Sequence, residues 1–501
     1  MVNTRPVLVD RIRRYALRKN KYPHKTAALD NMSENDLENL SFSPENAWKK
    51  LDEEKKEDVF DFAEDYQEFL TQSKTERQTV DEAEKILRKD GFKSLSEYDE
   101  LTTGDKVYMI NRNKSLVAAV IGEEDLTHGC NLVTSHIDAP RLDLKARPLY
   151  EDKEASVAML QTHYYGGIKK YQWVSIPLAI HGRVVKEDGT PVDIEIGEDD
   201  DDPIFVISDL LPHLSKKKQG ERKMKEVIKG EELDLLIAGI PIDDEDVDER
   251  VKMKVLKLLN DKYDIEEEDL ASAELEIVPA HDTRDVGFDR SMLGGYGQDD
   301  RICAYTSLRA LLDVENPKKT GVVIFFDKEE IGSEGNTGAN SDMLETFYSE
   351  LLNRYKDDYT IHDHRKMMDN SKAISGDVSP AVNPAFKGVH DLQNAAVLGK
   401  GIAINKFTGA GGKYSANDAH AEYVALIRKV LNENDVPWQP AELGKVDEGG
   451  GGTVAKFLAE LNIDVIDAGT PILGMHSPFE VVSKVDLFYT YEAYNAFLES
   501  K

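Results

Sequence analysis

The feature of this sequence that most restricts its fold is an apolar run that ends abruptly in charged residues. Residues 321–326, GVVIFF, are followed at once by Asp327, Lys328, Glu329 and Glu330. A short, unbroken apolar run is typical of a strand buried on both faces, as in a parallel sheet covered by helices. Because buried, unpaired carboxylates are costly, we expect Glu329 and Glu330 to reach water, a cation, or both.

Strand-like and helix-like runs alternate through the last part of the chain. Residues 301–314 and 451–461 have a helical pattern, and residues 463–469 read as another buried strand. The final segment, 483–498, is predicted to be an amphipathic helix, with Leu487, Tyr491, Tyr494 and Leu498 on one face. This alternation indicates an α/β fold with a mainly parallel central sheet and helices on both faces.

The sequence patterns of residues 45–122 are consistent with the same fold class. Residues 45–100 read as helical and charged, and Thr79–Glu82 has the spacing of a capping box ahead of Ala83 and Ile86. Residues 106–122 read as two strands joined by a turn at Asn111–Lys114.

The pattern changes between about residues 146 and 280. Short β-like runs alternate there with charged blocks at 197–202, 216–225 and 243–250, which we interpret as solvated loops or helix faces. We therefore predict an α/β domain built from residues 1–145 and 281–501, interrupted by an inserted β-rich domain at 146–280. The charged stretch 215–270 has no function that its sequence reveals.

Net charge, hydropathy and cysteine content indicate the partners and the compartment that suit this chain. The formal net charge of −32 argues against nucleic acid and anionic membranes as partners. No apolar run is long enough for a membrane span, and residues 1–25 are basic without the apolar core of a secretory signal. Cys130 and Cys303 stand in apolar contexts, so we expect reduced core thiols and a cytoplasmic protein.

Five polar clusters follow strand-like or loop segments, where α/β sheets place their ligands. Each also has a plain structural interpretation, such as a turn, a helix cap or a surface histidine. The clusters are His136 with Asp138, Asp299 with Asp300, Glu329 with Glu330, Asp377, and His476. Two histidines with an excess of carboxylates suit two divalent ions that share one aspartate, which leaves one carboxylate free as a general base.

In this order the clusters resemble the family of aspartyl aminopeptidase and vacuolar aminopeptidase I, which are dinuclear zinc metallopeptidases. The resemblance covers nearly the whole chain. It is carried by SHIDAPRLDLK, YGGIKKYQW, QDDRICAYTSLRAL, FFDKEEIGSEGNTGA, SGDVSPAVNP and AGTPILGMHSPFE.

The resemblance implies a role for each site residue. One metal would be held by His136, Asp299 and Asp377, and the other by Asp299, Glu330 and His476. Matching the following helix, YTSLRAL, to the family pattern puts the bridge at Asp299, and Asp300 stays an alternative.

The same resemblance implies the catalytic residues and the cofactor. Glu329 would be the general base for a metal-bridging water that attacks the first peptide bond, and Asp138 would orient His136. The ions would be Zn²⁺, although Co²⁺ or Mn²⁺ would also suit these ligands.

The resemblance further implies an assembly and a substrate. The inserted domain would pair subunits into dimers that build a tetrahedral dodecamer, and His213 would enter a neighbour's active site. Peptides with a free N-terminus would be the substrates, with Lys413 and Tyr414 as candidates for substrate contact. Because Lys413 is the one obvious cation near this pocket, the preferred N-terminal residue stays open.

The main hypothesis is thus a zinc-dependent aminopeptidase. Two alternatives are a dinuclear amidohydrolase acting on small N-acyl or amino-acid amides, and an inactive binding or scaffold protein that kept the fold. Metal content and the hydrolysis of free against N-acetylated substrates would discriminate among the three.

Overall fold

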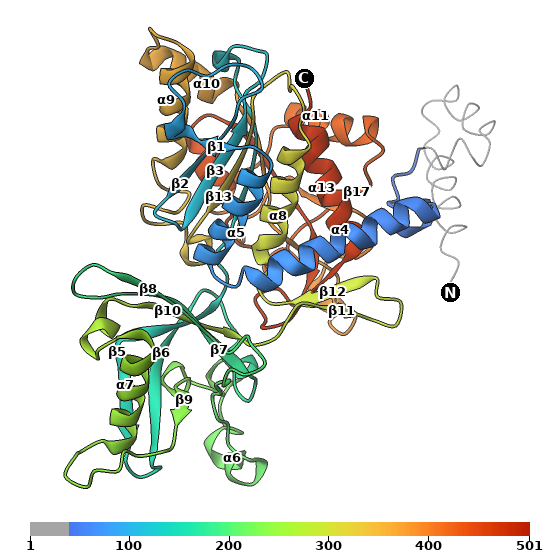
Figure 1. Ribbon diagram of the computed structural model, residues 1–501. Helices are drawn as coiled ribbons and strands as arrows, with labels where there is room; N and C mark the ends of the chain where they lie inside the picture. The colour runs from blue at the N-terminus through green and yellow to red at the C-terminus, as the bar shows by residue number, and fades with distance from the viewer. Residues whose placement is uncertain (1–39) are drawn as a thin grey trace, which may run out of the picture. The chain divides into compact units, whose positions relative to one another are not determined.

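The computed structural model describes residues 40–501, of which residues 46–501 form one compact unit (Figure 1). The basic segment 1–25 lies outside the described residues. Within 40–501, no helix has the length and apolarity needed to cross a bilayer. Cys130 and Cys303 are both buried and free, which confirms the expectation of reduced core thiols.

A nine-stranded sheet forms the centre of this unit. In spatial order its strands are β1 (Lys93–Ser94), β2 (Lys106–Asn111), β3 (Ser115–Val120), β13 (Gly321–Phe326), β4 (Asn131–His136), β14 (Lys372–Ser375), β18 (Asp464–Gly469), β16 (Ile402–Asn405) and β17 (Trp438–Pro440). The neighbours β13, β4, β14 and β18 are parallel, whereas β3 runs antiparallel to β13 and β16 runs antiparallel to β18.

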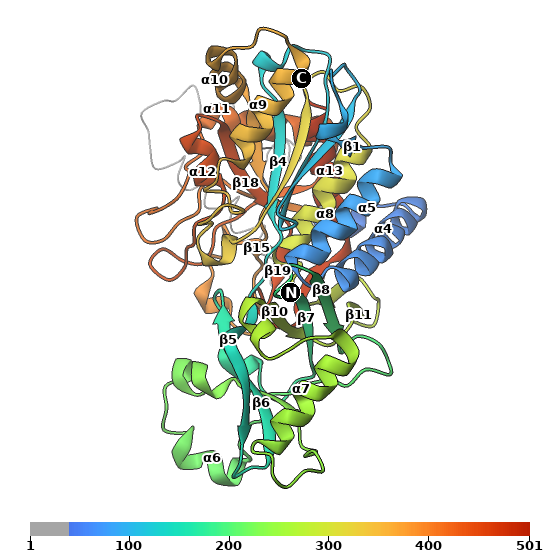
Figure 2. The ribbon, with the colours of Figure 1, turned by 60° about the vertical axis from the view of Figure 1, so that its left-hand side comes forward.

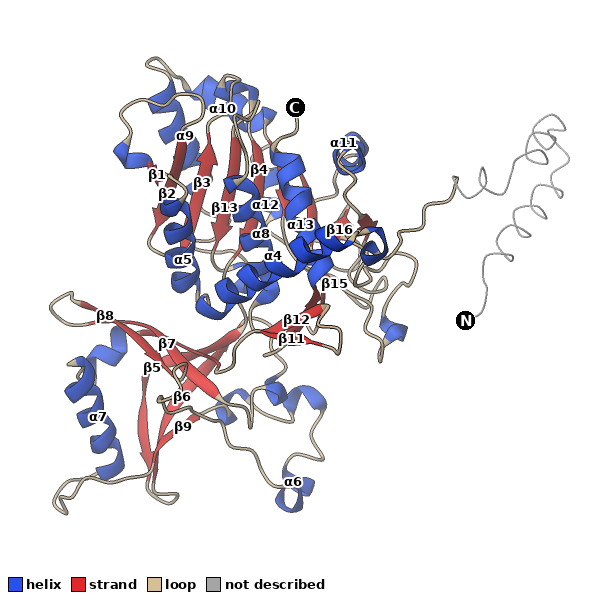
Figure 3. Cartoon of the chain, turned by 45° about the vertical axis from the view of Figure 1, so that its right-hand side comes forward, coloured by secondary structure: helices blue, strands red, loops and turns tan. Residues whose placement is uncertain are grey.

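Helices cover both faces of this sheet, and the α/β class is confirmed. The helices are α4 (Glu53–Gln72), α5 (Glu76–Lys89), α8 (Gln298–Leu312), α9 (Met343–Tyr355), α10 (Ile361–Asn370), α11 (Ala421–Glu433), α12 (Ala455–Glu460) and α13 (Lys484–Leu498). Alternate residues of one strand enter different cores: Val323 packs with α8 and α13, and Val322 packs with α9 and α10. Figure 3 shows α5, α8 and α13 in front of β3, β13 and β4.

Two local predictions differ from the structure. The capping box of α5 is formed by Thr75 and Gln78, one turn before the predicted Thr79, whose hydroxyl instead donates to the Thr75 carbonyl within the helix. Helix α13 is buried on most of its circumference, Asp486 and Thr490 included, because it packs against α4, α8 and α11 as well as the sheet. The prediction of an amphipathic helix with one buried face therefore understates how much of α13 is buried.

Residues 141–279 build a second, six-stranded sheet with a core of its own. Its strands, in order, are β8 (Pro191–Ile196), β7 (Leu178–Val185), β10 (Glu274–Pro279), β5 (Arg141–Asp152), β6 (Val157–Tyr165) and β9 (Leu235–Ala238), with α6 (Pro212–Lys218) and α7 (Arg250–Tyr263). We call this the second sheet. Strands β5 and β6 form a long antiparallel pair (Figure 2).

A smaller third sheet links distant segments of the chain. It contains β11 (Arg284–Val286), β12 (Met292–Gly295), β20 (Glu480–Ser483), β19 (Pro471–Leu473) and β15 (Ser379–Pro380). Gly295 pairs with Glu480 across β12 and β20, so the loop that leads into α8 lies beside the turn before β20.

Candidate metal centre

The carboxyl ends of three neighbouring parallel strands place four of the predicted residues. His136 ends β4, Glu329 and Glu330 begin a short 3₁₀ turn after β13, and Asp377 follows β14. Because Phe326 is in register with His136, the chain leaves both strands at the same level. This edge is where open α/β sheets bind their ligands.

The third sheet brings the remaining two predicted residues to this edge. Asp299 stands at the start of α8 with an extended backbone, φ −84° and ψ 103°, and the Asp299–Asp300 peptide is cis. His476 lies in the turn between β19 and β20 with φ 64°, in the left-handed region.

Asp299 lies between the two histidines. Its Oδ1 is 3.2 Å from His136 Nε2, and its Oδ2 is 3.3 Å from His476 Nε2. Glu330 Oε1 is 3.5 Å from the same His476 nitrogen, and Glu329 Oε2 is 4.0 Å from His136 Nε2. The two adjacent glutamates therefore face different histidines.

The structure contains three groups of potential metal ligands, and within each group one ligand atom per residue lies within 4.8 Å of the others. They are His136 with Glu329 and Glu330, His136 with Asp300 and Asp377, and Asp299 with Glu330 and His476. Asp377 thus lies near His136. The aspartate grouped with that pair is Asp300, which also accepts a 3.4 Å contact from the His136 backbone N–H.

Asp138 holds the first histidine and both glutamates. Its carboxylate lies 3.3 Å from His136 Nδ1 and accepts the backbone N–H groups of Glu329 at 3.0 Å and Glu330 at 3.2 Å. His136 Nδ1 also lies 3.0 Å from the Asp138 carbonyl. A second partner of this kind fixes the orientation and tautomer of a ligating histidine.

Glu480 plays the same part on the other side, and the sequence reasoning missed it. Its carboxylate accepts the backbone N–H of Asp299 at 3.1 Å and that of His476 at 2.8 Å. Glu480 is 1% exposed, and burial raises its pKa to about 8. An acidic residue placed four positions after His476, inside a strand-like run, was the available signal.

No lysine or arginine among the described residues neutralises the carboxylates of the candidate centre. Among residues 40–501, no lysine or arginine forms an ion pair with Asp299, Glu329, Glu330 or Asp377. Burial and the Asp299 charge raise the pKa of Glu330 well above its usual range, and burial raises that of Glu329 to about 7. Burial opposes protonation of His476, but Asp299 and Glu330 outweigh it and raise that pKa to about 10.

These residues fit divalent metal ions. Glu330 Oε1 is buried and has no hydrogen-bond partner, and it faces His476. A cluster of imidazole and carboxylate groups that is short of positive charge has the donor set of zinc.

The predicted substrate residues have other surroundings in the described part of the chain. Lys413 Nζ is 2.8 Å from Asp418 and lies 3.8 Å from the Phe407 ring centroid, so its charge is paired. Tyr414 is 79% exposed. His213 is exposed on α6 of the second sheet. The roles of all three stay predictions.

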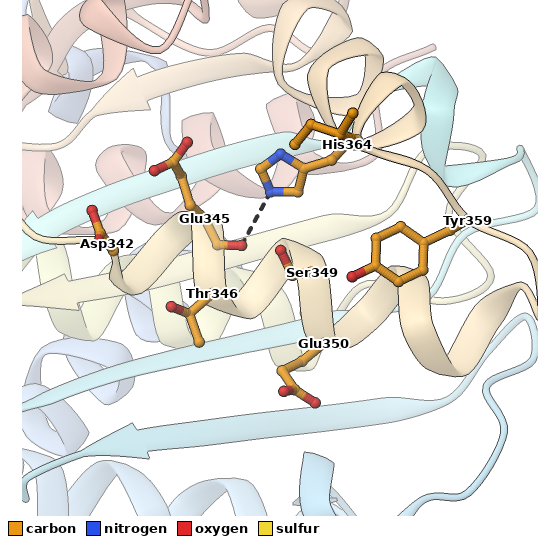
Figure 4. Close-up of a pocket in the computed structure, with 8 residues that line it drawn as sticks. Asp342, Glu345, Thr346, Ser349, Glu350, Tyr359 and His364 are labelled. Carbon is orange, nitrogen blue, oxygen red and sulfur yellow. Dashed lines mark hydrogen bonds between the residues drawn. The ribbon is translucent and has the colours of Figure 1, made fainter.

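A separate hollow lies between α9 and α10 (Figure 4). It is lined by Asp342, Glu345, Thr346, Ser349, Glu350, Tyr359, Ile361 and His364. His364 is 5% exposed, and its Nε2 lies 3.1 Å from the Glu345 carbonyl. It therefore fastens α10 to α9.

Comparisons with known proteins identify the family to which this chain is similar. The family model of the aminopeptidase I zinc metalloproteases (M18) matches residues 69–498. A probable M18 family aminopeptidase 1 of Thermotoga maritima is 54% identical over 447 residues, which is 89% of this chain and 97% of that protein.

Solved structures give the same result. The crystal structure of an M18 family aminopeptidase from Thermotoga maritima has a TM-score of 0.88 and 51% identity, and covers 92% of this chain and 100% of that one. The dodecamer of S. cerevisiae mApe1 shares the fold, with a TM-score of 0.69, 22% identity, and coverage of 87% of this chain and 96% of that one.

Proposed function

This chain belongs to the M18 family of aminopeptidase I zinc metalloproteases, and on that basis we propose that its zinc aminopeptidase activity depends on two ions at the candidate metal centre. One ion would be held by His136, Asp299 and Asp377, and the other by Asp299, Glu330 and His476. The supporting observation is that Asp299 presents one carboxylate oxygen to each histidine, at 3.2 and 3.3 Å.

Asp299 suits the bridging position better than Asp300 for the same reason. The Asp300 carboxylate accepts the His136 backbone N–H at 3.4 Å and has an oxygen within 4.8 Å of a His136 ring nitrogen, but it approaches neither imidazole as closely as Asp299 does. It is fully buried, and burial raises its pKa well above the ordinary value. A carboxyl group in this position suits a structural role behind the ligands.

Glu329 is the proposed general base. Bound zinc ions would acidify a water molecule and polarise the scissile carbonyl. Glu329 takes the proton of the attacking water and passes it to the nitrogen of the leaving peptide. A pKa of about 7 suits a group that must accept and then donate a proton near neutral pH.

The identity of the bound metal and the preferred first residue of the substrate are to be measured. Imidazole and carboxylate groups also bind Co²⁺ and Mn²⁺, and availability decides which ion is loaded. The substrates would be peptides with a free N-terminus. A preference for an acidic first residue would need a free cation, and Lys413 is already paired with Asp418.

We also propose that the predicted insert, residues 146–280, forms a dimerisation domain through the second sheet. This sheet has its own apolar core, which suits a separate structural role. The S. cerevisiae relative of the same fold is a dodecamer, which supports a homo-oligomer here. The predicted entry of His213 into a neighbouring subunit belongs to this proposal.

A substrate panel tests the proposed function. The metal-free protein is reloaded with Zn²⁺, Co²⁺ or Mn²⁺ and assayed on chromogenic amides of acidic, neutral and basic amino acids, each free and N-acetylated. We expect chelator-sensitive hydrolysis of the free amides and no measurable hydrolysis of their acetylated forms. Equal turnover of both forms would favour the amidohydrolase, and no metal-dependent turnover would contradict the proposal.

A further inference from the structure

Three consecutive residues, the last of β6 and the two that follow it, touch the candidate metal centre. Tyr165, the last residue of β6, donates its hydroxyl to Asp138 Oδ2 at 2.9 Å. The Gly167 carbonyl lies 3.0 Å from His476 Nδ1. A Cβ atom on Gly166 would lie 3.3 Å from both Cβ and Oε2 of Glu330. The segment 165–167 thus meets both sides of the centre.

The hydroxyl of Tyr165 completes the surroundings of Asp138. This carboxylate is fully buried, and its other donors are the backbone N–H groups of Glu329 and Glu330. One Asp138 oxygen receives the Glu329 N–H and faces His136, and the other receives the Glu330 N–H and the Tyr165 hydroxyl. Tyr165 is the only side-chain hydroxyl that donates to Asp138 among residues 40–501.

The tyrosine ring is held firmly in this position. Tyr165 pairs with Arg141 across β5 and β6, and the Arg141 guanidinium lies 4.0 Å from the ring centroid. Arg141 is itself fixed by Glu276 at 3.1 Å and Glu76 at 3.5 Å. Glu276 belongs to the second sheet and Glu76 to α5, so this buried ion network ties the ring to both.

We propose that Tyr165 and Gly167 are positioning residues for the metal ligands. Through Asp138, the Tyr165 hydroxyl orients His136 and the backbone of the two glutamates. The Gly167 carbonyl fixes the ring of His476 so that its Nε2 faces Asp299 and Glu330. The second sheet thereby supplies part of the support of the centre, in addition to its proposed role in dimerisation. This inference rests on the two-ion centre of the proposed function.

Tyr165→Phe tests the hydroxyl, with Tyr164→Phe as its matched control. Tyr164 is adjacent on β6 but 41% exposed, and its ring stacks on His163. Zinc affinity is measured by competition with a chelator on the full chain, with kcat and KM measured in parallel. Loss of an outer partner typically costs about 10–100-fold in metal affinity or activity. We expect a loss of that size for Tyr165→Phe, with KM nearly unchanged and no loss for Tyr164→Phe.

Gly167→Ala tests the contact between the Gly167 carbonyl and the His476 ring. Its Cβ would lie 3.2 Å from His476 Nδ1, so the imidazole must shift, whereas the control Gly239→Ala adds its methyl group to open space in the same part of the chain. We expect Gly167→Ala to lower zinc occupancy by up to one ion per chain. The thermal midpoint of each metal-free variant should match the metal-free wild type, which separates this effect from unfolding.

The measurements separate the positioning role of Tyr165 and Gly167 from the proposed two-ion function. If the wild type binds two zinc ions and both Tyr165→Phe and Gly167→Ala retain its zinc affinity and kcat, the positioning role is wrong. If the wild type itself binds no zinc, the proposed two-ion function fails.

Discussion

Two adjacent glutamates reach different histidines because they stand in a 3₁₀ turn. Glu329–Ile331 forms this turn after β13, and successive side chains in a 3₁₀ helix point about 120° apart. Glu329 therefore faces His136, and Glu330 faces His476. The identity of both residues was predictable from a polar pair after a buried strand. Which histidine each glutamate faces depends on the turn geometry.

Glu329→Gln should remove turnover and keep the metal. The amide has nearly the same shape but cannot accept the proton, so kcat should fall by about 10²–10⁴-fold, the usual contribution of a general base. Zinc per chain, measured by elemental analysis, should stay at the wild-type value. Glu334→Gln, an exposed change in the same loop, is the control. A variant at position 329 that keeps most of its kcat would show that another group is the base.

The position of Asp377 depends on how closely two strands approach beyond their ends. Ser375 of β14 is in register with Asp467 of β18, and the chain after β14 passes over Gly469. A Cβ on Gly469 would lie 2.0 Å from the Asp377 carbonyl oxygen. The close approach of these two segments therefore requires glycine at position 469. This approach fixes the position of Asp377 at the edge of the sheet.

Gly469→Ala should displace Asp377. Because the added methyl group meets backbone, the free energy of unfolding should fall by about 1–3 kcal/mol, as overpacked sites usually do. Zinc occupancy should fall with it. Chemical denaturation and elemental analysis measure the two effects. Gly388→Ala, which meets no atom within 4 Å, is the control. Wild-type stability and zinc content in Gly469→Ala would contradict this account.

Local pattern alone was misleading for the start of α5. Both Thr75 and Thr79 have a capping residue type three positions later, Gln78 and Glu82. The structure uses Thr75, whose hydroxyl accepts the Gln78 N–H at 3.2 Å. Tertiary packing decides between the two threonines. Glu76, the residue after Thr75, forms a 2.8 Å ion pair with Lys114, and this contact fixes where the helix begins.

Across the compact unit, the candidate metal centre lies where segments from all three sheets meet. The first contributes His136, Glu329, Glu330 and the approach to Asp377, the third positions Asp299 and His476, and the second touches them through residues 165–167. Ions bound at such a junction stabilise the native state over the unfolded chain, in which these segments separate.

Zinc should therefore raise the thermal stability of the whole chain. Free zinc at about 100 times its Kd adds about 2.7 kcal/mol to the free energy of unfolding, by mass action. The melting temperature of the metal-free protein should rise on zinc addition and fall again with chelator, as measured by calorimetry. Mg²⁺, which prefers oxygen ligands and retains its water, is the control ion. Equal melting temperatures with and without zinc would contradict binding at this junction.

The sequence by itself determined the α/β class, the central strands, the buried thiols and the residue types of the centre. Apolar period and polar residues after strands are local properties, so His136, Glu330 and His476 could be proposed without a structure. The tertiary structure decided which oxygen faces which nitrogen. The brace of Glu480, the contact of Tyr165 with Asp138 and the orientation of Asp299 join residues far apart in the chain. Such hydrogen bonds depend on distance in space, which no local pattern encodes.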